Sequence, residues 1–305
     1  MICAGHHGLM KIATASYPLD ILPDWAAYED KLTRWVREAA DEGAELLVFP
    51  EYAAMELATL VGLDVAGDLE ASLFAVADRL ADADALHAHL AATFGVHILA
   101  ASAPATDALP DGVTRPVNRA RFFAPSGAMG VQDKQIMTRF EAEEWDVVPG
   151  GPLQLFDTGL GKIGVLICYD SEFPLLGRAL ADADIILVPS VTEAMAGYCR
   201  VRIGAQARAL ENQCVTVMAS VVGAAAWSPA VDISTGAGGI FGPPDIGFPD
   251  TGIIALGALN VPGWVYGDVD IATIAAVRAD GVVLNRHHWD LQQGRADPVT
   301  VTPLA

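Results

Sequence analysis

Residues 162–174, KIGVLICYDSEFP, place a cysteine at the end of an apolar run and directly before a turn. Residues 162–167 predict a strand, and Cys168 follows it at once. Open α/β sheets bind their ligands at the carboxyl ends of strands, so the thiol of Cys168 is a candidate nucleophile. On this local pattern alone, simple packing remains the alternative, because free cysteine is among the most buried residue types.

Two further predicted strands end on charged residues. Residues 45–51, ELLVFPE, end on Glu51, and residues 130–134, GVQDK, end on Lys134. Together with Cys168 they offer a general base, an oxyanion stabiliser and a nucleophile, the groups that acyl transfer through a thiol requires. Taken singly, Glu51 could cap a turn and Lys134 could be a solvated lysine on an edge strand.

In this order, the Phe-Pro-Glu, Asp-Lys and Cys-Tyr-Asp segments resemble the nitrilase superfamily of carbon-nitrogen hydrolases. The resemblance continues in residues 117–120, 125–127, 207–212 and 268–270, and it covers roughly residues 11–289. It implies an α/β fold, a four-layer α-β-β-α sandwich with two mixed sheets. It also implies a Glu-Lys-Cys triad supported by a second glutamate, no metal or other cofactor, and a homodimer or larger even homo-oligomer formed through a helical face.

The supporting glutamate has three candidates, Glu141, Glu143 and Glu144. In the family this residue usually stands four positions before an aromatic or apolar residue that precedes Pro-Gly. The spacing from Glu141 to Trp145 fits, and Glu141 is therefore expected in this role. Glu143 is the alternative, because one residue more than usual separates Trp145 from the Pro-Gly at 149–150.

The expected chemistry follows from these side chains. Cys168 would attack an amide, carbamoyl or nitrile carbon as its thiolate, while Glu51 takes the thiol proton and later activates water. Lys134 would stabilise the tetrahedral oxyanion, with the backbone N–H of Tyr169 as a second donor. True nitrilases usually carry Trp-Glu after the cysteine, whereas Cys-Tyr-Asp resembles the amidase and carbamoylase branches.

The expected activity is therefore hydrolysis of a small amide or N-carbamoyl compound through a thioester-type intermediate on Cys168, with release of ammonia or an amine. Three alternatives stay open: nitrile hydrolysis, acyl transfer to an amine, and a catalytically silent scaffold. The sequence does not identify the substrate.

Glu172 is a candidate substrate-binding residue. In ω-amidase-like relatives the motif commonly reads Cys-Tyr-Asp-x-Arg-Phe-Pro, and this chain has Glu172 in place of that arginine. A carboxylate near the pocket would disfavour anionic substrates and favour neutral or cationic amides. The structural alternative is that Glu172 and Arg202 form a reversed ion pair.

Composition bounds the possible partners. The 305 residues include 18 basic and 38 acidic side chains, and this net charge of −20 argues against nucleic acid or an anionic membrane surface as a partner. The four cysteines form neither a disulfide framework nor a Cys-x-x-Cys pair, so a reducing cytoplasm is expected. No window approaches the roughly 20 apolar residues of a membrane span.

One domain is expected over residues 10–305, because no linker or low-complexity tract interrupts them. Residues 1–9 lack a secretory signal pattern, and Met10 begins a segment that reads like a natural start. Residues 1–9 are therefore expected to be an extension, added in cloning or by an early start assignment.

Hydrophobic periodicity predicts strands that alternate with helices, plus two hairpins, as in an α/β fold with mixed sheets. Helices are predicted near residues 24–43, 69–93, 173–181 and 199–212, and further strands at 12–15, 96–100, 118–124, 129–132, 153–156, 184–190 and 215–221. Residues 236–242 are expected to form a flexible loop. His287 and His288 are placed on one strand and hence on opposite faces, which argues against a shared metal ion.

Overall fold

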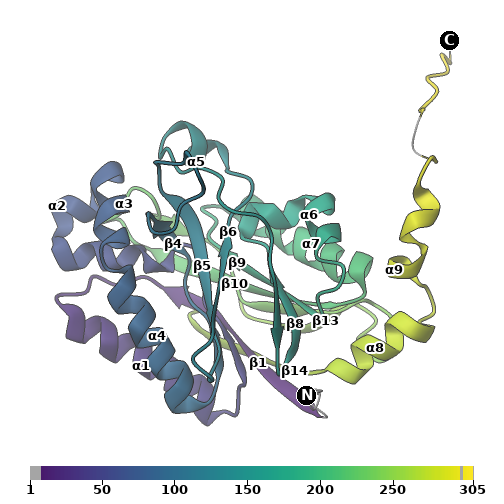
Figure 1. The fold of residues 1–305 in the computed structure, drawn as a ribbon, viewed down its shortest axis with the longest axis horizontal. Coiled ribbons are helices and arrows are strands. Elements are labelled where there is room, and N and C mark those ends of the chain that lie inside the picture. Colours follow the sequence, from purple (N-terminus) through teal and green to yellow (C-terminus); the bar gives the residue numbers. More distant parts are fainter. Residues whose placement is uncertain (1–7, 296–297, 305) are drawn as a thin grey trace.

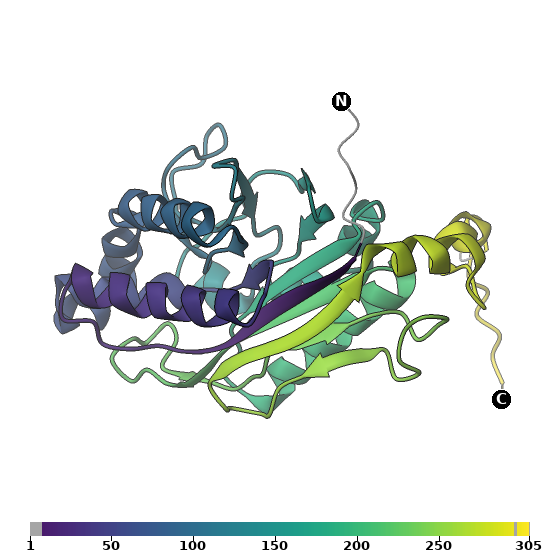
Figure 2. The ribbon, with the colours of Figure 1, turned by 90° about the horizontal axis from the view of Figure 1, so that it is seen from below.

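Two β-sheets lie face to face, and helices cover the outer face of each (Figures 1 and 2). This computed structural model describes residues 8–295 and 298–304. The predicted four-layer α-β-β-α sandwich is confirmed. Of the segment expected to be an extension, residues 1–7 lie outside the described residues, whereas Leu9 already begins strand β1 (Leu9–Pro18).

The first sheet has the order β6-β5-β3-β2-β1-β14, with β4 also paired to β5. Its strands other than β1 are β2 (Leu46–Val48), β3 (His97–Leu99), β4 (Ala103–Ala105), β5 (Val117–Phe123), β6 (Met129–Asp133) and β14 (Gly263–Asp270). β1, β2 and β3 run parallel, and the outer pairs are antiparallel. The sheet is therefore mixed, as predicted.

The second sheet has the order β7-β8-β9-β10-β12-β13, and β11 adds to the end of β10. Its strands are β7 (Leu155–Thr158), β8 (Gly161–Val165), β9 (Ile185–Ser190), β10 (Val215–Ala224), β11 (Ile233–Ser234), β12 (Gly239–Phe241) and β13 (Ile253–Leu256). β8, β9 and β10 run parallel, and the outer pairs are again antiparallel.

The two sheets join at one corner, where Ser16–Pro18 of β1 pair in parallel with Ser220–Val222 of β10. The parallel strands of both sheets therefore run in the same direction. Their carboxyl ends lie at one end of the sandwich, which is the end where open α/β sheets place their ligands.

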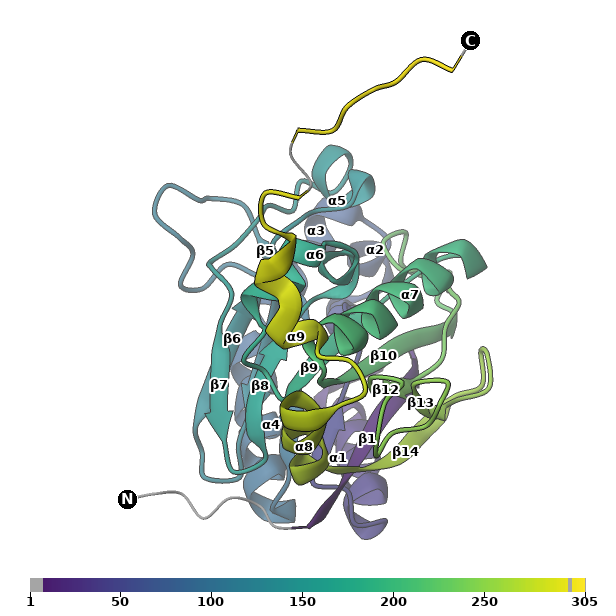
Figure 3. The ribbon, with the colours of Figure 1, turned by 90° about the vertical axis from the view of Figure 1, so that its right-hand side faces the viewer.

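Each sheet has its own helical layer. α1 (Trp25–Asp41), α3 (Leu69–Ala77) and α4 (Leu80–Phe94) cover the first sheet, and α6 (Pro174–Ala179) and α7 (Met195–Asn212) cover the second (Figures 1 and 3). Asp24 caps α1 by accepting the N–H of Ala27 at 2.9 Å, as the sequence predicts. The connections hold η1 (Ala53–Val61), α2 (Leu63–Ala66), α5 (Arg139–Glu143) and η2 (Cys168–Glu172).

The chain ends in α8 (Ile271–Asp280), α9 (Asn285–His288) and η3 (Trp289–Gln292), and residues 298–304 extend away from the sheets (Figure 3). Within the described residues, no helix combines the length and apolar character needed to cross a membrane.

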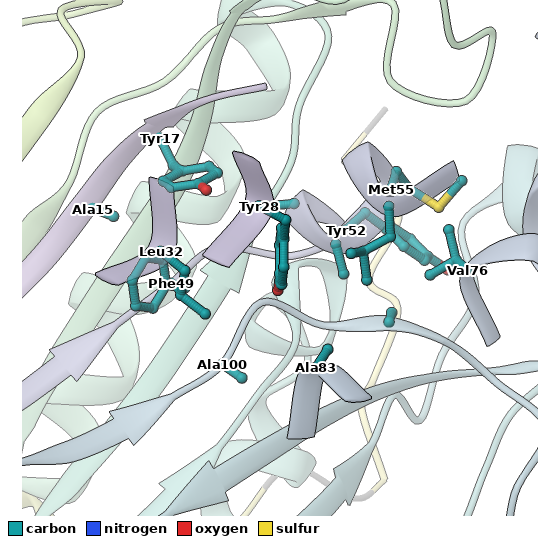
Figure 4. Close-up of a cluster of buried hydrophobic side chains, with 14 of the residues drawn as sticks. Ala15, Tyr17, Tyr28, Leu32, Phe49, Tyr52, Met55, Val76, Ala83 and Ala100 are labelled. Atoms are coloured by element: carbon teal, nitrogen blue, oxygen red, sulfur yellow. The ribbon is translucent and has the colours of Figure 1, made fainter. Parts of the chain in front are cut away.

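Alternation along the strands divides the core into layers. Ala13, Ala15 and Phe49 pack with the residues of α1 and α4, whereas Ile12 and Leu46 pack with residues of the second sheet. Figure 4 shows buried side chains between the first sheet and its helices, where Phe49 lies close to Leu32 of α1. Successive side chains of a strand point to opposite faces of the sheet. The packing of one side chain therefore also determines the face on which each following side chain lies.

Three predictions about elements are wrong. The helical stretch 69–93 is two helices, because α3 packs on η1 and β4 whereas α4 packs on α1, so the chain turns between them. The expected loop 236–242 contains the buried strand β12, which pairs with both β10 and β13. His287 and His288 lie on α9 and not on a strand, since local helical hydrogen bonds form there.

Candidate active site

The ends of three strands meet around one cavity of about 720 Å³. Glu51 follows β2, Lys134 follows β6 directly, and Cys168 follows β8 as the first residue of η2. All three line the cavity, and Glu141 of α5 lines it as well. The structure thus brings together the four residues that the sequence selects, although they are spread along the chain from Glu51 to Cys168.

Cys168 occupies a tight turn between strand and helix. Its φ of +49° lies in the left-handed region, which a residue with a β-carbon adopts only when its surroundings enforce it. The Ser171 hydroxyl donates to the Cys168 carbonyl oxygen at 2.6 Å and tightens the turn. Helix α7 packs closely behind it: a β-carbon at Gly204 would lie 2.8 Å from the carbonyl oxygen of Ser171.

Lys134 lies between two carboxylates. Its Nζ is 2.8 Å from Glu51 Oε1 and 2.6 Å from Glu141 Oε2, and all three side chains are buried. Burial lowers the pKa of Lys134, but the two carboxylates outweigh that effect and hold the pKa above its ordinary value. The side chain is therefore a charged ammonium group in a dry site, where electrostatic interactions are strong.

Glu141 has several donors besides the lysine. The Thr138 N–H and hydroxyl each donate to Oε2 at 2.9 Å, and the Tyr52 hydroxyl donates to Oε1 at 3.0 Å. Burial raises the pKa of Glu141, but Lys134 and Thr138 reverse the shift and leave the pKa below its ordinary value. By contrast, Glu143 is exposed and pairs with Arg139 at 2.9 Å.

The pKa of Glu51 is shifted in the opposite direction to that of Glu141. It accepts the Asn118 side-chain amide at 2.9 Å and the Val191 N–H at 3.0 Å, yet burial raises its pKa more than Lys134 lowers it. Burial and then the Glu51 charge also raise the pKa of Cys168 well above its usual value. The thiol of Cys168 thus lies beside a carboxylate of raised basicity, and chemically such a pair can work as a nucleophile and a general base.

Two further predicted residues lie in the cavity wall. Tyr169 lines it and packs edge-on against Phe173, with ring centroids 4.8 Å apart. Glu172 also lines it, but its ion-pair partner is Arg200, at 3.5 Å, and not Arg202. The predicted Glu172–Arg202 pair is therefore wrong: residues two positions apart on a helix point about 160° apart, so Arg200 faces Glu172 and Arg202 does not.

Sequence reasoning missed three contributors. Tyr52 donates a hydrogen bond to Glu141, and the Val191 N–H donates one to Glu51. Nothing in the local sequence of either residue indicates this role. Asn118 appeared only within the family resemblance; the structure shows that its amide is buried on β5, where a polar group needs a hydrogen-bond partner. Among the residues described, no three or more His, Cys, Asp or Glu side chains form a group that could hold a metal ion.

Comparisons with known proteins identify relatives of this chain. A family model described as carbon-nitrogen hydrolase matches residues 12–279. The probable hydrolase YhcX of Bacillus subtilis is 31% identical over 278 residues, which cover 90% of this chain but 52% of YhcX. The chain thus spans about half the length of that relative. The omega-amidase NIT2-B of Xenopus laevis is 25% identical over 63% of this chain and 67% of its own length.

Solved structures share the fold. A carbon-nitrogen hydrolase from Helicobacter pylori has a TM-score of 0.72 at 18% identity, covering 96% of this chain and 97% of that one. Saccharomyces cerevisiae Nit3, described as a member of the nitrilase superfamily, has a TM-score of 0.68 at 21% identity, covering 89% of this chain and 93% of that one.

Proposed function

The chain belongs to the carbon-nitrogen hydrolase family of the nitrilase superfamily, and from this premise we propose that it hydrolyses a small amide or N-carbamoyl compound at Cys168. One arrangement supports this proposal above all others. A charged lysine, two carboxylates with opposite pKa shifts and a thiol line the same cavity.

In the proposed reaction Glu51 takes the proton of the Cys168 thiol as sulfur attacks the carbonyl carbon. Lys134 and the Tyr169 N–H stabilise the oxyanion of the tetrahedral intermediate. The carbon–nitrogen bond then breaks, and Glu51 returns its proton to the leaving ammonia or amine. A thioester-type intermediate remains on the sulfur.

Water completes the cycle. Glu51 deprotonates the water that attacks this intermediate, and the sulfur leaves as the thiol after recovering that proton. Glu141 holds Lys134 in place and keeps its ammonium charged, which is a supporting role and not a proton-transfer role. The raised pKa of Glu51 and the lowered pKa of Glu141 support this division of labour.

Glu172 is proposed to select the substrate by charge. Its side chain is 21% exposed in the cavity wall, and its cationic partner Arg200 is 62% exposed and 3.5 Å away. A pair this open to water is weakly coupled, so the carboxylate stays available to a donor or cation on the substrate. Neutral or cationic amides are therefore favoured over anionic ones.

Nitrile hydrolysis and acyl transfer to an amine would use the same side chains. A silent scaffold is less well supported, because it has no use for three buried charged groups around a thiol.

The test is an ammonia-release screen over aliphatic amides, ω-amides, N-carbamoyl compounds and nitriles, with Cys168→Ala as the control. Turnover of an amide or carbamoyl compound that disappears in the control is expected. Turnover of nitriles alone would replace the amidase proposal, and turnover that survives Cys168→Ala would end the covalent mechanism.

We also propose a homodimer or larger even assembly located in the cytoplasm. Exposed apolar side chains on α6 and α7 support self-association: Leu175, Ile203 and Leu210 are 77%, 66% and 39% exposed. Cys168, Cys199 and Cys214 are unpaired, as expected in a reducing compartment. Light scattering that finds an active monomer at micromolar concentration would remove the dimer.

A further inference from the structure

Asp170 connects the turn that carries Cys168 to the segment that follows Lys134. Its carboxylate accepts the Ile136 N–H at 2.9 Å, and its two oxygens lie 3.1 and 3.2 Å from the Gln135 N–H. The side chain is 1% exposed, so these hydrogen bonds form in a dry environment. The contacts join η2 to the first two residues after the lysine.

The two joined segments are otherwise far apart in the chain. Gln135 and Ile136 lie between β6 and α5, whereas Asp170 follows β8 in the other sheet. The Gln135 side chain also donates to the carbonyl oxygens of Asp133 and Gly151, each at 2.7 Å. The backbone beyond Lys134 is thus held from two sides, and Asp170 supplies the side that faces the nucleophile.

Asp170 does not belong to the cavity wall that Cys168, Lys134 and Tyr169 line. A substrate in the cavity would therefore meet the residues on either side of the connection and not Asp170 itself. Lys134 acts at an oxyanion that forms on the carbon bonded to Cys168, so a small displacement between the two segments weakens that interaction.

We propose that Asp170 is a positioning residue that fixes Lys134 relative to Cys168 through the backbone N–H groups of Gln135 and Ile136. The proposal rests on the amide hydrolysis proposed above, because it assigns Lys134 to the oxyanion. Its structural half, the connection between the two segments, stands without any substrate.

The charge state of Asp170 fits this role. Its pKa is raised to about 7: burial raises the pKa most, Lys134 and the two N–H groups lower it in part, and the Glu51 charge adds a small increase. At about pH 8 the carboxyl group is mostly ionised and accepts both N–H groups through charge-assisted hydrogen bonds. Measurements at this pH therefore compare the wild-type carboxylate with a neutral replacement.

The experiment uses Asp170→Asn in the full chain, since asparagine keeps the shape but loses the charge and one acceptor oxygen. With the best substrate of the screen, kcat is expected to fall about tenfold or more while KM changes less than threefold. Hydrogen exchange at the amides of Gln135 and Ile136 is expected to accelerate at least tenfold. A kcat within twofold of wild type, or unchanged exchange, would overturn the proposal.

Glu56→Gln is the matched control for neutralising a buried carboxylate. Glu56 is also 1% exposed, but it binds Lys31 and Tyr17 beneath the helical layer. Its variant is expected to melt at a lower temperature and, when folded, to keep kcat. An equal loss of kcat in both variants would show a general effect of destabilisation and contradict positioning.

Two further outcomes remain decisive. If no amide is turned over, the proposed function fails, yet the exchange measurement still tests the connection. If Asp170→Asn does not fold, wild-type exchange decides: both amides must exchange at least a hundredfold more slowly than in an unstructured peptide, and faster exchange would contradict the proposal.

Discussion

The hydroxyl group of Tyr52 donates a hydrogen bond to Glu141 across 3.0 Å, between the residue after Glu51 and helix α5. Burial and the nearby Glu141 charge raise the pKa of Tyr52 well above its usual value, so this hydroxyl stays a donor. Trp145 packs on the tyrosine ring with centroids 4.7 Å apart and holds it in place. The carboxylate of Glu141 is thus held in place by the residue that follows Glu51, the proposed general base.

Tyr52→Phe is therefore expected to lower kcat. A hydrogen bond to a charged group contributes about 1.5–3 kcal/mol, which corresponds to roughly a tenfold or greater loss if the bond matters in the transition state. Steady-state kinetics measures the effect. Tyr28→Phe is the control, a buried tyrosine of α1 outside the cavity, and equal losses in the two variants would contradict the prediction.

Cys168 is expected to be the only essential thiol among the described cysteines. Brief iodoacetamide treatment followed by intact-mass analysis should show activity falling in step with modification of Cys168. Cys199→Ala serves as the control, because Cys199 is partly buried on α7 and does not line the cavity. Activity that persists after complete modification of Cys168 would rule out the covalent mechanism.

Glu51→Gln and Lys134→Met should each reduce the chemical step severely. Loss of one oxyanion donor typically costs about 2.7–4 kcal/mol, or roughly 100- to 1,000-fold in kcat. Glu141→Gln should also reduce kcat, because Lys134 then keeps one carboxylate partner. Glu143→Gln is the matched control at an exposed position, and a severe defect there with a mild one in Glu141→Gln would exchange the two roles.

Glu172→Gln tests selection by charge. Removing the carboxylate from the cavity wall should raise kcat/KM for an anionic amide relative to a matched neutral one, and lower it for a cationic amide. Arg202→Gln is the control, since Arg202 is not the ion-pair partner of Glu172. A wild-type enzyme that prefers the anionic amide would refute the assignment.

His87 is expected to make the protein less stable in mild acid. Burial lowers the pKa of this side chain from 6.5 to about 4, and its ring stacks on Phe123. Between about pH 6.5 and 4 the unfolded chain binds a proton that the folded protein excludes, so the free energy of unfolding decreases as the pH falls through this window. Across the whole window, the free energy of unfolding is expected to decrease by about 3 kcal/mol.

Urea unfolding of wild type and His87→Gln across this pH range measures the effect. The variant should be less stable at neutral pH, because packing is lost, but its stability should depend less on pH between about 6.5 and 4. His89→Gln is the exposed control. An unchanged slope in His87→Gln would show that another group causes the acid sensitivity.

The sequence by itself determined the layers and the positions of the reactive groups along the chain. Strand patterns that alternate with helical patterns predict α/β layers with mixed sheets, since each element must bury one face, and the resemblance adds the four-layer sandwich. Glu51, Lys134 and Cys168 could be selected because each stands at the end of a predicted strand, and strand ends are local features. The resemblance then grouped them as one site.

Only the tertiary structure decided which charged groups meet. Glu141 and Glu143 lie on one short helix with similar local sequence, yet Glu141 points to Lys134 and Glu143 to solvent. Tyr52 binds Glu141, which is 89 residues away in the chain, and Asp170 binds two backbone N–H groups that are 34 and 35 residues away. Glu172 pairs with Arg200 and not with Arg202. Such pairings depend on how the two sheets and helix α7 pack, because an ion pair or hydrogen bond requires contact in space and leaves no period in the sequence.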